Sequence, residues 1–169
     1  MPLLFSALVP PPEVIESIRD EVSGISAPKS VRWSAPEGWH VTLGFYGEEA
    51  DPTDRVTWLR RRLAGQAAPT LRLEGAGSFS HVLYLGVYGE GLVELATAAG
   101  AGRDRPYLPH LTLARTRESV PPELPRRLSA YTSEAWTATD VVLMRSDRAP
   151  TGARYSVVET FPLESGHAR

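Results

Sequence analysis

Two copies of one short pattern carry residues that can do chemistry. His40-Val41-Thr42-Leu43 lies in the first third of the chain, and His110-Leu111-Thr112-Leu113 follows in the second half. Each copy alternates polar and apolar residues, which is typical of a half-buried β-strand. Because residues two apart on a strand point to the same side, each histidine shares a polar face with its threonine. The next residue on each polar face is small, Gly44 or Ala114, and leaves a shallow space there.

These groups suit acid–base chemistry on a small anion such as a phosphate. Cleavage of a phosphoester requires that one proton be taken from the attacking oxygen and another be given to the leaving oxygen. Histidine has an unperturbed pKa of about 6.5, so one imidazole can be neutral while another is charged near neutral pH. His40 and His110 can therefore supply a base and an acid, while Thr42 and Thr112 donate hydrogen bonds to phosphoryl oxygens.

Metal ligation is the competing use of two histidines. Metal sites in proteins usually add a third histidine, a cysteine or nearby carboxylates. Neither motif contains an acidic residue, Glu48 and Glu49 come after the first motif, and the chain has no cysteine. We therefore expect neither a metal nor another cofactor.

The overall composition limits the classes of function. The chain has 169 residues, of which 42% are hydrophobic and 22% charged, and these values fit one soluble domain over residues 1–169. The net charge of −2 argues against a wide basic groove for a long duplex, but it permits a local positive pocket for one RNA end. The absence of cysteine excludes disulfides and thiolate nucleophiles and is compatible with a cytoplasmic location.

The apolar start of the chain predicts a buried strand. The segment from Leu3 to Val9 lacks the basic flank of a secretory signal and is followed by three prolines, at positions 10–12. No apolar run approaches the length of a bilayer span, so we expect no membrane association.

Periodicity and turn residues outline the elements that hold the two motifs. Further strands are expected at about 31–34, 71–73, 82–87, 136–144 and 154–161, and helices at about 13–23, 54–65 and 92–96, with a helical turn after Pro121. A Gly-Ala-Gly turn at 75–77 is expected to break the strand that starts at 71, and the tail after Pro162 is expected to be loose. The pattern favours an α+β fold with antiparallel sheets in two lobes of similar plan, one motif strand from each lining a shared cleft.

The two motifs and their surroundings resemble a known family. Gly38-Trp39-His40-Val41-Thr42-Leu43-Gly44-Phe45-Tyr46-Gly47-Glu48 and Pro109-His110-Leu111-Thr112-Leu113-Ala114-Arg115 resemble the two signatures of the 2H phosphoesterases. The closer resemblance is to the RNA 2′,3′-cyclic phosphodiesterases, also called 2′-5′ RNA ligase-like proteins. The proline-rich exit of the first strand and the segments 31–33, 75–79 and 155–163 also fit, so the resemblance covers nearly the whole chain.

The resemblance implies a fold, a reaction and roles for the motif residues. The fold is bilobal and pseudo-twofold, with a metal-free cleft between two intertwined lobes. The reaction is hydrolysis of an RNA terminal 2′,3′-cyclic phosphate to a 2′-phosphate. His40 gives a proton to the leaving 3′ oxygen, His110 takes one from water, and Thr42 and Thr112 hold the phosphate. Joining of RNA ends through 2′-5′ bonds is implied as a secondary activity.

Three further residues are candidates for substrate contact. Arg115 closes the second motif, but strict alternation places it opposite His110, so it reaches the phosphate only if the strand ends or bulges near Ala114. Otherwise it forms an ion pair elsewhere. Trp33 and Tyr46 are candidates either for stacking a nucleobase at the cleft rim or for the core, and alternation places Tyr46 on the face of His40.

The other histidines and a run of arginines are expected to have no role in catalysis. His81 lacks a threonine partner, and His167 lies in the tail. The run from Arg60 to Arg62 fits a solvated helix face better than an RNA patch.

Two other functions remain open at this point. The chain can be a non-catalytic module that binds nucleotides or RNA ends, or it can act on another small cyclic phosphate, such as ADP-ribose 1″,2″-cyclic phosphate, or on 2′-5′ oligonucleotides. In each case we expect a monomer whose partners are RNA 3′ ends or small cyclic nucleotides, without an obligatory protein partner.

Overall fold

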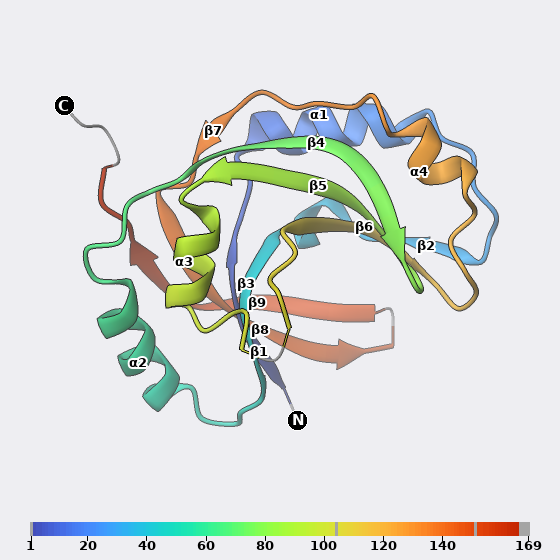
Figure 1. Ribbon diagram of the computed structural model, residues 1–169. Helices are drawn as coiled ribbons and strands as arrows, with labels where there is room; N and C mark the ends of the chain where they lie inside the picture. The colour runs from blue at the N-terminus through green and yellow to red at the C-terminus, as the bar shows by residue number, and fades with distance from the viewer. Residues whose placement is uncertain (1, 104, 151, 166–169) are drawn as a thin grey trace.

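A single antiparallel sheet organises the chain (Figure 1). The computed structural model describes residues 2–103, 105–150 and 152–165. Within them eight strands run in the order β7-β4-β5-β6-β3-β1-β8-β9, and a ninth, β2, pairs with β6. The strands are β1 (Leu3–Leu8), β2 (Val31–Trp33), β3 (Val41–Glu48), β4 (Thr70–Phe79), β5 (Val82–Glu90), β6 (His110–Thr116), β7 (Trp136–Thr137), β8 (Asp140–Ala149) and β9 (Gly152–Pro162). The helices are α1 (Pro12–Ser23), α2 (Thr53–Leu63), α3 (Leu92–Ala98) and α4 (Glu123–Arg127), with a 3₁₀ turn at Pro36–Gly38.

The two motif strands are neighbours in the middle of this sheet. β3 and β6 pair antiparallel through Val41 and Leu111, which directly follow the two motif histidines. The pairing therefore relates one motif to the other by a local twofold axis. One half of the sheet, β7-β4-β5-β6, lies on one side of the axis, and β3-β1-β8-β9 lies on the other. The predicted α+β fold with two antiparallel halves is confirmed.

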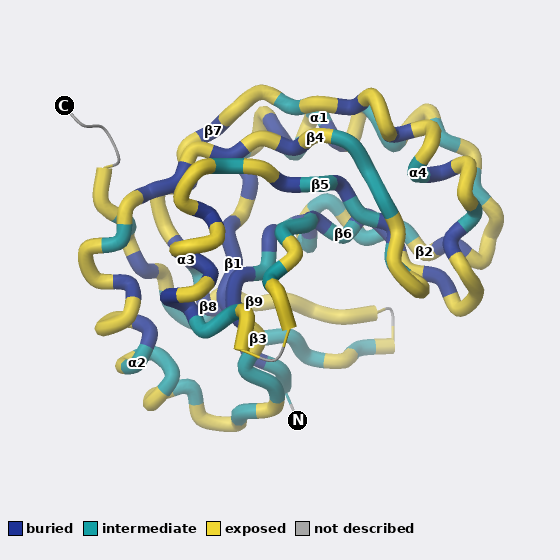
Figure 2. Tube along the Cα trace, viewed as in Figure 1, coloured by how far each residue is buried: buried dark blue, intermediate teal, exposed yellow. Residues whose placement is uncertain are grey.

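Apolar residues of the motif strands lie in the core, as their alternation predicts. Val41, Leu43, Leu111 and Leu113 are each at most 2% exposed, and Figure 2 shows the buried stretches along these strands. Helices α3 and α4 pack against the strands β3, β4 and β5, and α2 packs against β9. The core thus anchors the backbone of both motifs and leaves their polar face free.

A bulge interrupts the alternation of β3 directly after its motif. Phe45 pairs with Phe5 and Thr42 pairs with Ala7, so β3 has two residues between these pairs where β1 has one. Both residues between Thr42 and Phe45 are buried. The bulge reverses the phase of the strand, so Phe45 rather than Gly44 follows Thr42 on the polar face.

The strand β6 contains the corresponding bulge. Ala114 pairs with Leu83 and Thr112 pairs with Tyr84, so β6 has one residue between these pairs where β5 has none. Ala114 is 1% exposed, and Arg115 comes next on the polar face. The prediction that Gly44 and Ala114 lie on the polar faces is therefore wrong in both lobes, because each bulge turns the small residue into the core.

Several other elements differ from the sequence prediction. Strand β4 is not broken at 75–77, since a bulge between Leu73 and Ala76 absorbs the glycines and the strand continues to Phe79. The expected strand at 136–144 is two strands, β7 and β8. The start of the tail is held, because the backbone N–H of Leu163 donates to the carbonyl of Thr139. His167 lies outside the described residues.

Within the described part of the chain, no helix is both long and apolar enough to cross a membrane.

Gly44 provides a test of the bulge in β3. A Cβ at this position would overlap the carbonyl oxygen of Ala99, which follows α3, so Gly44→Ala should destabilise the fold. Overpacking of this kind costs about 1–3 kcal/mol, and contact with backbone leaves little room for relief. Urea unfolding followed by circular dichroism measures the loss.

The matched control is Gly24→Ala. There an added Cβ would meet only the Arg127 guanidinium, at 3.6 Å, which is an ordinary contact. A Gly44→Ala protein as stable as the Gly24→Ala protein would contradict the close approach of α3 to the bulge.

Candidate active site

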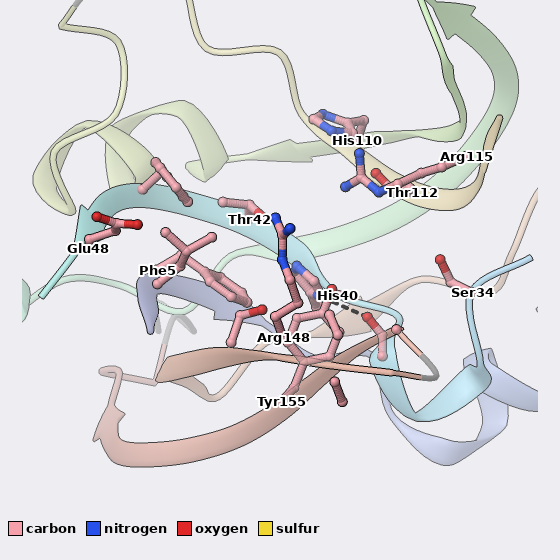
Figure 3. Close-up of a pocket in the computed structure, with 17 residues that line it drawn as sticks. Phe5, Ser34, His40, Thr42, Glu48, His110, Thr112, Arg115, Arg148 and Tyr155 are labelled. Atoms are coloured by element: carbon pink, nitrogen blue, oxygen red, sulfur yellow. Dashed lines mark hydrogen bonds between the residues drawn. The ribbon is translucent and has the colours of Figure 1, made fainter. Parts of the chain in front are cut away.

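A cavity of about 960 Å³ opens over the polar faces of the two motif strands (Figure 3). His40, Thr42, His110 and Thr112 all line it, so the structure brings together the four residues that the motifs single out. The third wall is the hairpin formed by β8 and β9. Figure 3 shows His110 and Thr112 across the cavity from His40, with the hairpin below.

The register of β3 and β6 sets the motifs head to tail. Because Val41 pairs with Leu111, continuing the antiparallel register by one residue sets each histidine opposite the threonine of the other motif. A second link joins the motifs, since the Tyr107 hydroxyl donates to the carbonyl of Thr42 at 2.6 Å. Tyr107 precedes β6, so the approach to the second motif is bonded to the backbone of the first. A small anion between the strands meets groups from both motifs.

Both imidazoles are held in the same way. The Nδ1 of His40 is 2.7 Å from the carbonyl oxygen of Gly38, and the Nδ1 of His110 is 2.8 Å from that of Leu108. A carbonyl oxygen only accepts hydrogen bonds, so Nδ1 donates and carries the proton in both rings. Nε2 is thus the atom of each ring that gains or loses a proton in the cavity.

Aromatic rings enclose the two histidines unequally. Phe5 stacks on the His40 ring with centroids 4.9 Å apart, and Tyr155 meets the same ring edge-on at 5.6 Å. Within the described ranges, the aromatic neighbours of His110 are inclined or edge-on, with Phe79 at 5.2 Å and Tyr84 at 5.6 Å. The flat contact with Phe5 covers one face of the His40 imidazole.

This burial affects the charge of His40. Burial is the main cause that lowers the pKa of His40 below its ordinary value. The hydrogen bond to the Gly38 carbonyl opposes this, while the nearby charges of His110 and Arg115 lower the pKa further. Burial and these two charges favour the neutral form of His40, and a bound anion would favour its protonation.

Arg115 lies in the cavity because of the bulge in β6. The sequence predicts this position only if the strand bulges near Ala114, and it does. Among the described residues Arg115 has neither an ion pair nor a side-chain hydrogen bond, so the alternative of a structural ion pair is wrong. Its guanidinium is available to an anion held by the two motifs.

Tyr46 and Trp33 do not line the cavity. The bulge in β3 turns Tyr46 to the core side, where its hydroxyl contacts Ser6 at 2.8 Å and donates to the carbonyl of Ala99 at 2.7 Å. Burial raises the pKa of Tyr46 to about 12. Trp33 packs against the core, and the next residue, Ser34, lines the cavity. The placement of Tyr46 on the His40 face is wrong, and core packing is the alternative that the structure supports for both residues.

The structure adds cavity residues to which the sequence reasoning does not lead. Phe45 is 64% exposed and lines the cavity at the position after His40 that Arg115 occupies after His110. Arg148 and Tyr155 come from the β8–β9 hairpin. The shared offset is a usable signal for Phe45, whereas nothing near either motif in the sequence points to the hairpin.

The residues that the sequence excludes from catalysis lie away from the cavity. His81 is exposed, and its Nδ1 is 2.9 Å from the carbonyl oxygen of Glu118. Arg60 forms an ion pair with Glu159, and Arg62 donates to the carbonyl of Ala98. The arginine run therefore binds to the protein itself at these two positions.

Charge in the cavity differs from that of the whole chain. Among the residues that the structure describes, two arginines, Arg115 and Arg148, and one carboxylate, Glu48, line it, although the chain carries a net charge of −2. Figure 3 shows Glu48 at the end of the cavity away from Arg115. No group of three or more His, Cys, Asp or Glu side chains within the described ranges could hold a metal ion. The site therefore suits an anion that is bound by arginine, hydroxyl and imidazole groups.

Comparison with known families gives a consistent match. The family model described as "LigT like Phosphoesterase" matches residues 8–88 and 84–155. A Thermus thermophilus protein named RNA 2′,3′-cyclic phosphodiesterase is 31% identical, and the alignment covers 98% of this chain and 92% of that protein. An Archaeoglobus fulgidus protein of the same name is 29% identical over 88% of this chain and 92% of its own.

Solved structures match the fold over nearly the whole chain. The crystal structure of TT0787 from Thermus thermophilus has a TM-score of 0.80 and 25% identity, with 98% of this chain and all of that chain covered. E. coli LigT complexed with 3′-AMP has a TM-score of 0.78 and 27% identity, covering 96% of this chain and 98% of its own.

The environment of His40 predicts its titration. Its pKa, followed by NMR of the imidazole, should lie below about 6.5, the ordinary value for histidine. His110→Gln and Arg115→Gln should each raise it, because each removes a positive neighbour, but burial should keep it below the ordinary value. Arg154→Gln, which changes a charge outside the cavity lining, is the control. A pKa that does not respond to either cavity substitution would contradict the shared cavity.

The same shift has a consequence for stability. Between the lowered pKa of folded His40 and about 6.5, the unfolded chain binds more protons than the folded one, so the free energy of unfolding should rise with pH there. The contribution is complete above that range and is lost as pH falls through the folded pKa. Urea titrations at several pH values should show a weaker rise for His40→Gln than for the wild type.

Proposed function

This chain belongs to the LigT-like phosphoesterase family and is a phosphoesterase of the RNA 2′,3′-cyclic phosphodiesterase type, and we propose that His40 and His110 are its acid and base. Its substrate would be the 2′,3′-cyclic phosphate at an RNA 3′ end, and its product a 2′-phosphate. The names of the relatives support this substrate. A monomeric state and a cytoplasmic location remain predictions.

One observation carries the proposal. Two imidazoles are fixed through Nδ1 by backbone carbonyls, and both line one cavity, each on a strand that also presents a threonine hydroxyl. General acid–base catalysis needs two such groups within reach of one reacting centre. The antiparallel pairing of β3 and β6, which brings the two motifs together, supports the proposal.

The reaction balances with these two histidines alone. Neutral His110 takes a proton from water through Nε2, and the water oxygen forms a new bond to phosphorus. The bond from phosphorus to the 3′ oxygen breaks, and protonated His40 gives its Nε2 proton to that oxygen. The product carries a 2′-phosphate and a 3′-hydroxyl, and the two histidines have exchanged protonation states. This assignment of donor and acceptor follows the resemblance of the two motifs.

The substrate itself favours the protonated state of His40. Burial lowers the pKa of His40 and favours its neutral form. A phosphodiester anion beside the ring favours the imidazolium form and opposes this shift. His40 then holds a proton in contact with the phosphate, where it can be given to the leaving oxygen.

The hydroxyls and Arg115 act on the phosphoryl group. Thr42 and Thr112 face the cavity from opposite strands and can donate to the two non-bridging oxygens. Arg115 adds a charge that remains at every pH of interest. Donors that are already in place where charge develops stabilise the transition state without reorganisation.

The same groups would account for ligation as a secondary activity. If the 5′-hydroxyl of a second RNA replaces water, the same proton transfers form a 2′-5′ phosphodiester and release the 3′ oxygen. Such a reaction needs no further group in the protein. It requires only that the cavity admit a second strand.

The test is hydrolysis of a defined RNA by metal-stripped protein. An RNA that ends in a 2′,3′-cyclic phosphate should yield a 2′-phosphate, identified by mass and by sensitivity to phosphatase. His40→Ala and His110→Ala should each reduce turnover by about a hundred- to ten-thousand-fold, because each removes one proton transfer. His81→Ala is the matched control, since its ring is held by a carbonyl in the same way but lies outside the cavity.

Each contrary outcome has a definite meaning. Full turnover by either cavity mutant would exclude the paired mechanism. Absence of turnover in folded wild-type protein would favour a module that only binds RNA ends or an enzyme for another phosphodiester. ADP-ribose 1″,2″-cyclic phosphate and a 2′-5′-linked oligonucleotide would then be the next substrates to test.

A further inference from the structure

Arg148 is a cavity residue that the proposed reaction does not use. It lies on β8, in the hairpin that forms the third wall, and Figure 3 shows its side chain reaching from that hairpin into the cavity. Among the described residues it has neither an ion pair nor a side-chain hydrogen bond. A cation in this position is free to bind an anion that enters the cavity.

The hairpin has two different faces. Ser146 pairs with Tyr155 and Arg148 pairs with Ala153, and all four residues line the cavity. On the other face, Arg145 forms an ion pair with Asp147 at 3.0 Å. The cavity face thus combines one free arginine with small neighbours and an aromatic ring, which leaves room beside the guanidinium.

The cavity is larger than the terminal phosphate requires. Its volume of about 960 Å³ is at the upper end of the range of about 300–1,000 Å³ for pockets that enclose whole small ligands. The two motifs and Arg115 occupy only the part over β3 and β6. The remainder lies over the hairpin, whose strand β8 is two strands away from β3 in the sheet order, or about 10 Å between strand backbones at the usual spacing. Figure 3 shows the Arg148 side chain reaching back from β8 toward His40.

The charges indicate what occupies this extension. A cyclic phosphate carries one negative charge, and Arg115 faces it together with both threonines. A second cation therefore matches a second phosphate, and an RNA end provides one in the phosphodiester before its last nucleotide. Glu48 lies at the opposite end of the cavity from Arg115 and would repel a phosphate placed there.

We propose that Arg148 binds the phosphodiester that joins the terminal nucleotide to the rest of the RNA, so that the enzyme prefers an oligonucleotide end to a free nucleoside 2′,3′-cyclic phosphate. This inference rests on the proposed function and specifies its substrate class. Arg148 is a specificity residue that acts on substrate binding, and the proton transfers stay with His40 and His110.

Three substrates separate this role from other roles of an arginine. The first is a nucleoside 2′,3′-cyclic phosphate, which has one phosphate group. The second is a dinucleotide that ends in the same cyclic phosphate, and the third is that dinucleotide with an uncharged methylphosphonate linkage. The wild type should show about tenfold higher kcat/KM on the charged dinucleotide than on either of the other two, the increment expected of one charge-assisted contact.

Loss of the positive charge at Arg148 should remove this preference and nothing else. Arg148→Gln should lower kcat/KM about tenfold on the charged dinucleotide, mainly through KM, and leave the other two substrates unchanged. Arg148→Lys should restore most of the preference, because a point charge suffices for a phosphate. Arg154→Gln is the matched control, since it removes the same charge from β9 outside the cavity lining.

Salt dependence gives an independent readout. The slope of log affinity against log salt for a dinucleotide 2′-phosphate product should decrease by about 0.7 in Arg148→Gln, the value for one phosphate contact on a single strand. A role in packing the hairpin would not change this slope.

The possible outcomes distinguish failure of the inference about Arg148 from failure of the proposed function. An equal loss on all three substrates would place Arg148 at the terminal phosphate and overturn the inference. No loss on the charged dinucleotide would overturn it as well. Failure of the wild-type protein to turn over any of the three would overturn the proposed function and this inference with it.

Discussion

The antiparallel contact between β3 and β6 is the constraint on which the site depends. A single pairing, Val41 with Leu111, joins the two halves of the sheet, and it involves the residue after each motif histidine. Because the register is antiparallel, it converts a repeat in sequence into a local twofold axis in space. The hydrogen bond from Tyr107 to the carbonyl of Thr42 reinforces the same junction. A change of register by one residue would move one motif's polar groups into the core.

The two bulges occupy equivalent backbone positions in the two lobes, but the side chains that they turn into the cavity differ. Each strand carries its bulge directly after the motif, so the fifth residue after each histidine returns to the cavity. In one lobe that residue is the apolar Phe45, and in the other it is the cationic Arg115. Equivalent backbones therefore present different chemistry, one surface for flat apolar contact and one for charge. An anion with an attached ring system would meet both.

The sequence is sufficient for the motifs and their strands, because alternation is a local signal. It cannot establish the bulges, since these depend on how many residues the neighbouring strand offers, and so alternation alone places Tyr46 on the wrong face. For Arg115, the sequence predicts that the side chain reaches the cavity only if β6 bulges near Ala114, but it does not show whether the bulge forms. The sequence does not predict that the β8–β9 hairpin lines the cavity, and the reason is topological. The hairpin comes late in the chain and reaches the cavity because β8 pairs with β1, which in turn pairs with β3.

The surroundings of the two similar motifs are unequal, and we propose that this difference allows them to perform different tasks. His40 and His110 have the same contact to a carbonyl two residues before them, so local sequence alone does not separate acid from base. The difference between their surroundings comes from β1 and β9, whose Phe5 and Tyr155 contact the His40 ring, and burial lowers the pKa of His40. Enzymes that use paired groups of one type assign their roles through such differences in environment. The hairpin that carries Tyr155 also carries Arg148, so one element contacts the proposed proton donor and borders the proposed path of the substrate. Under the proposed function, proton donation and the binding of an RNA end are linked through a single wall of the cavity.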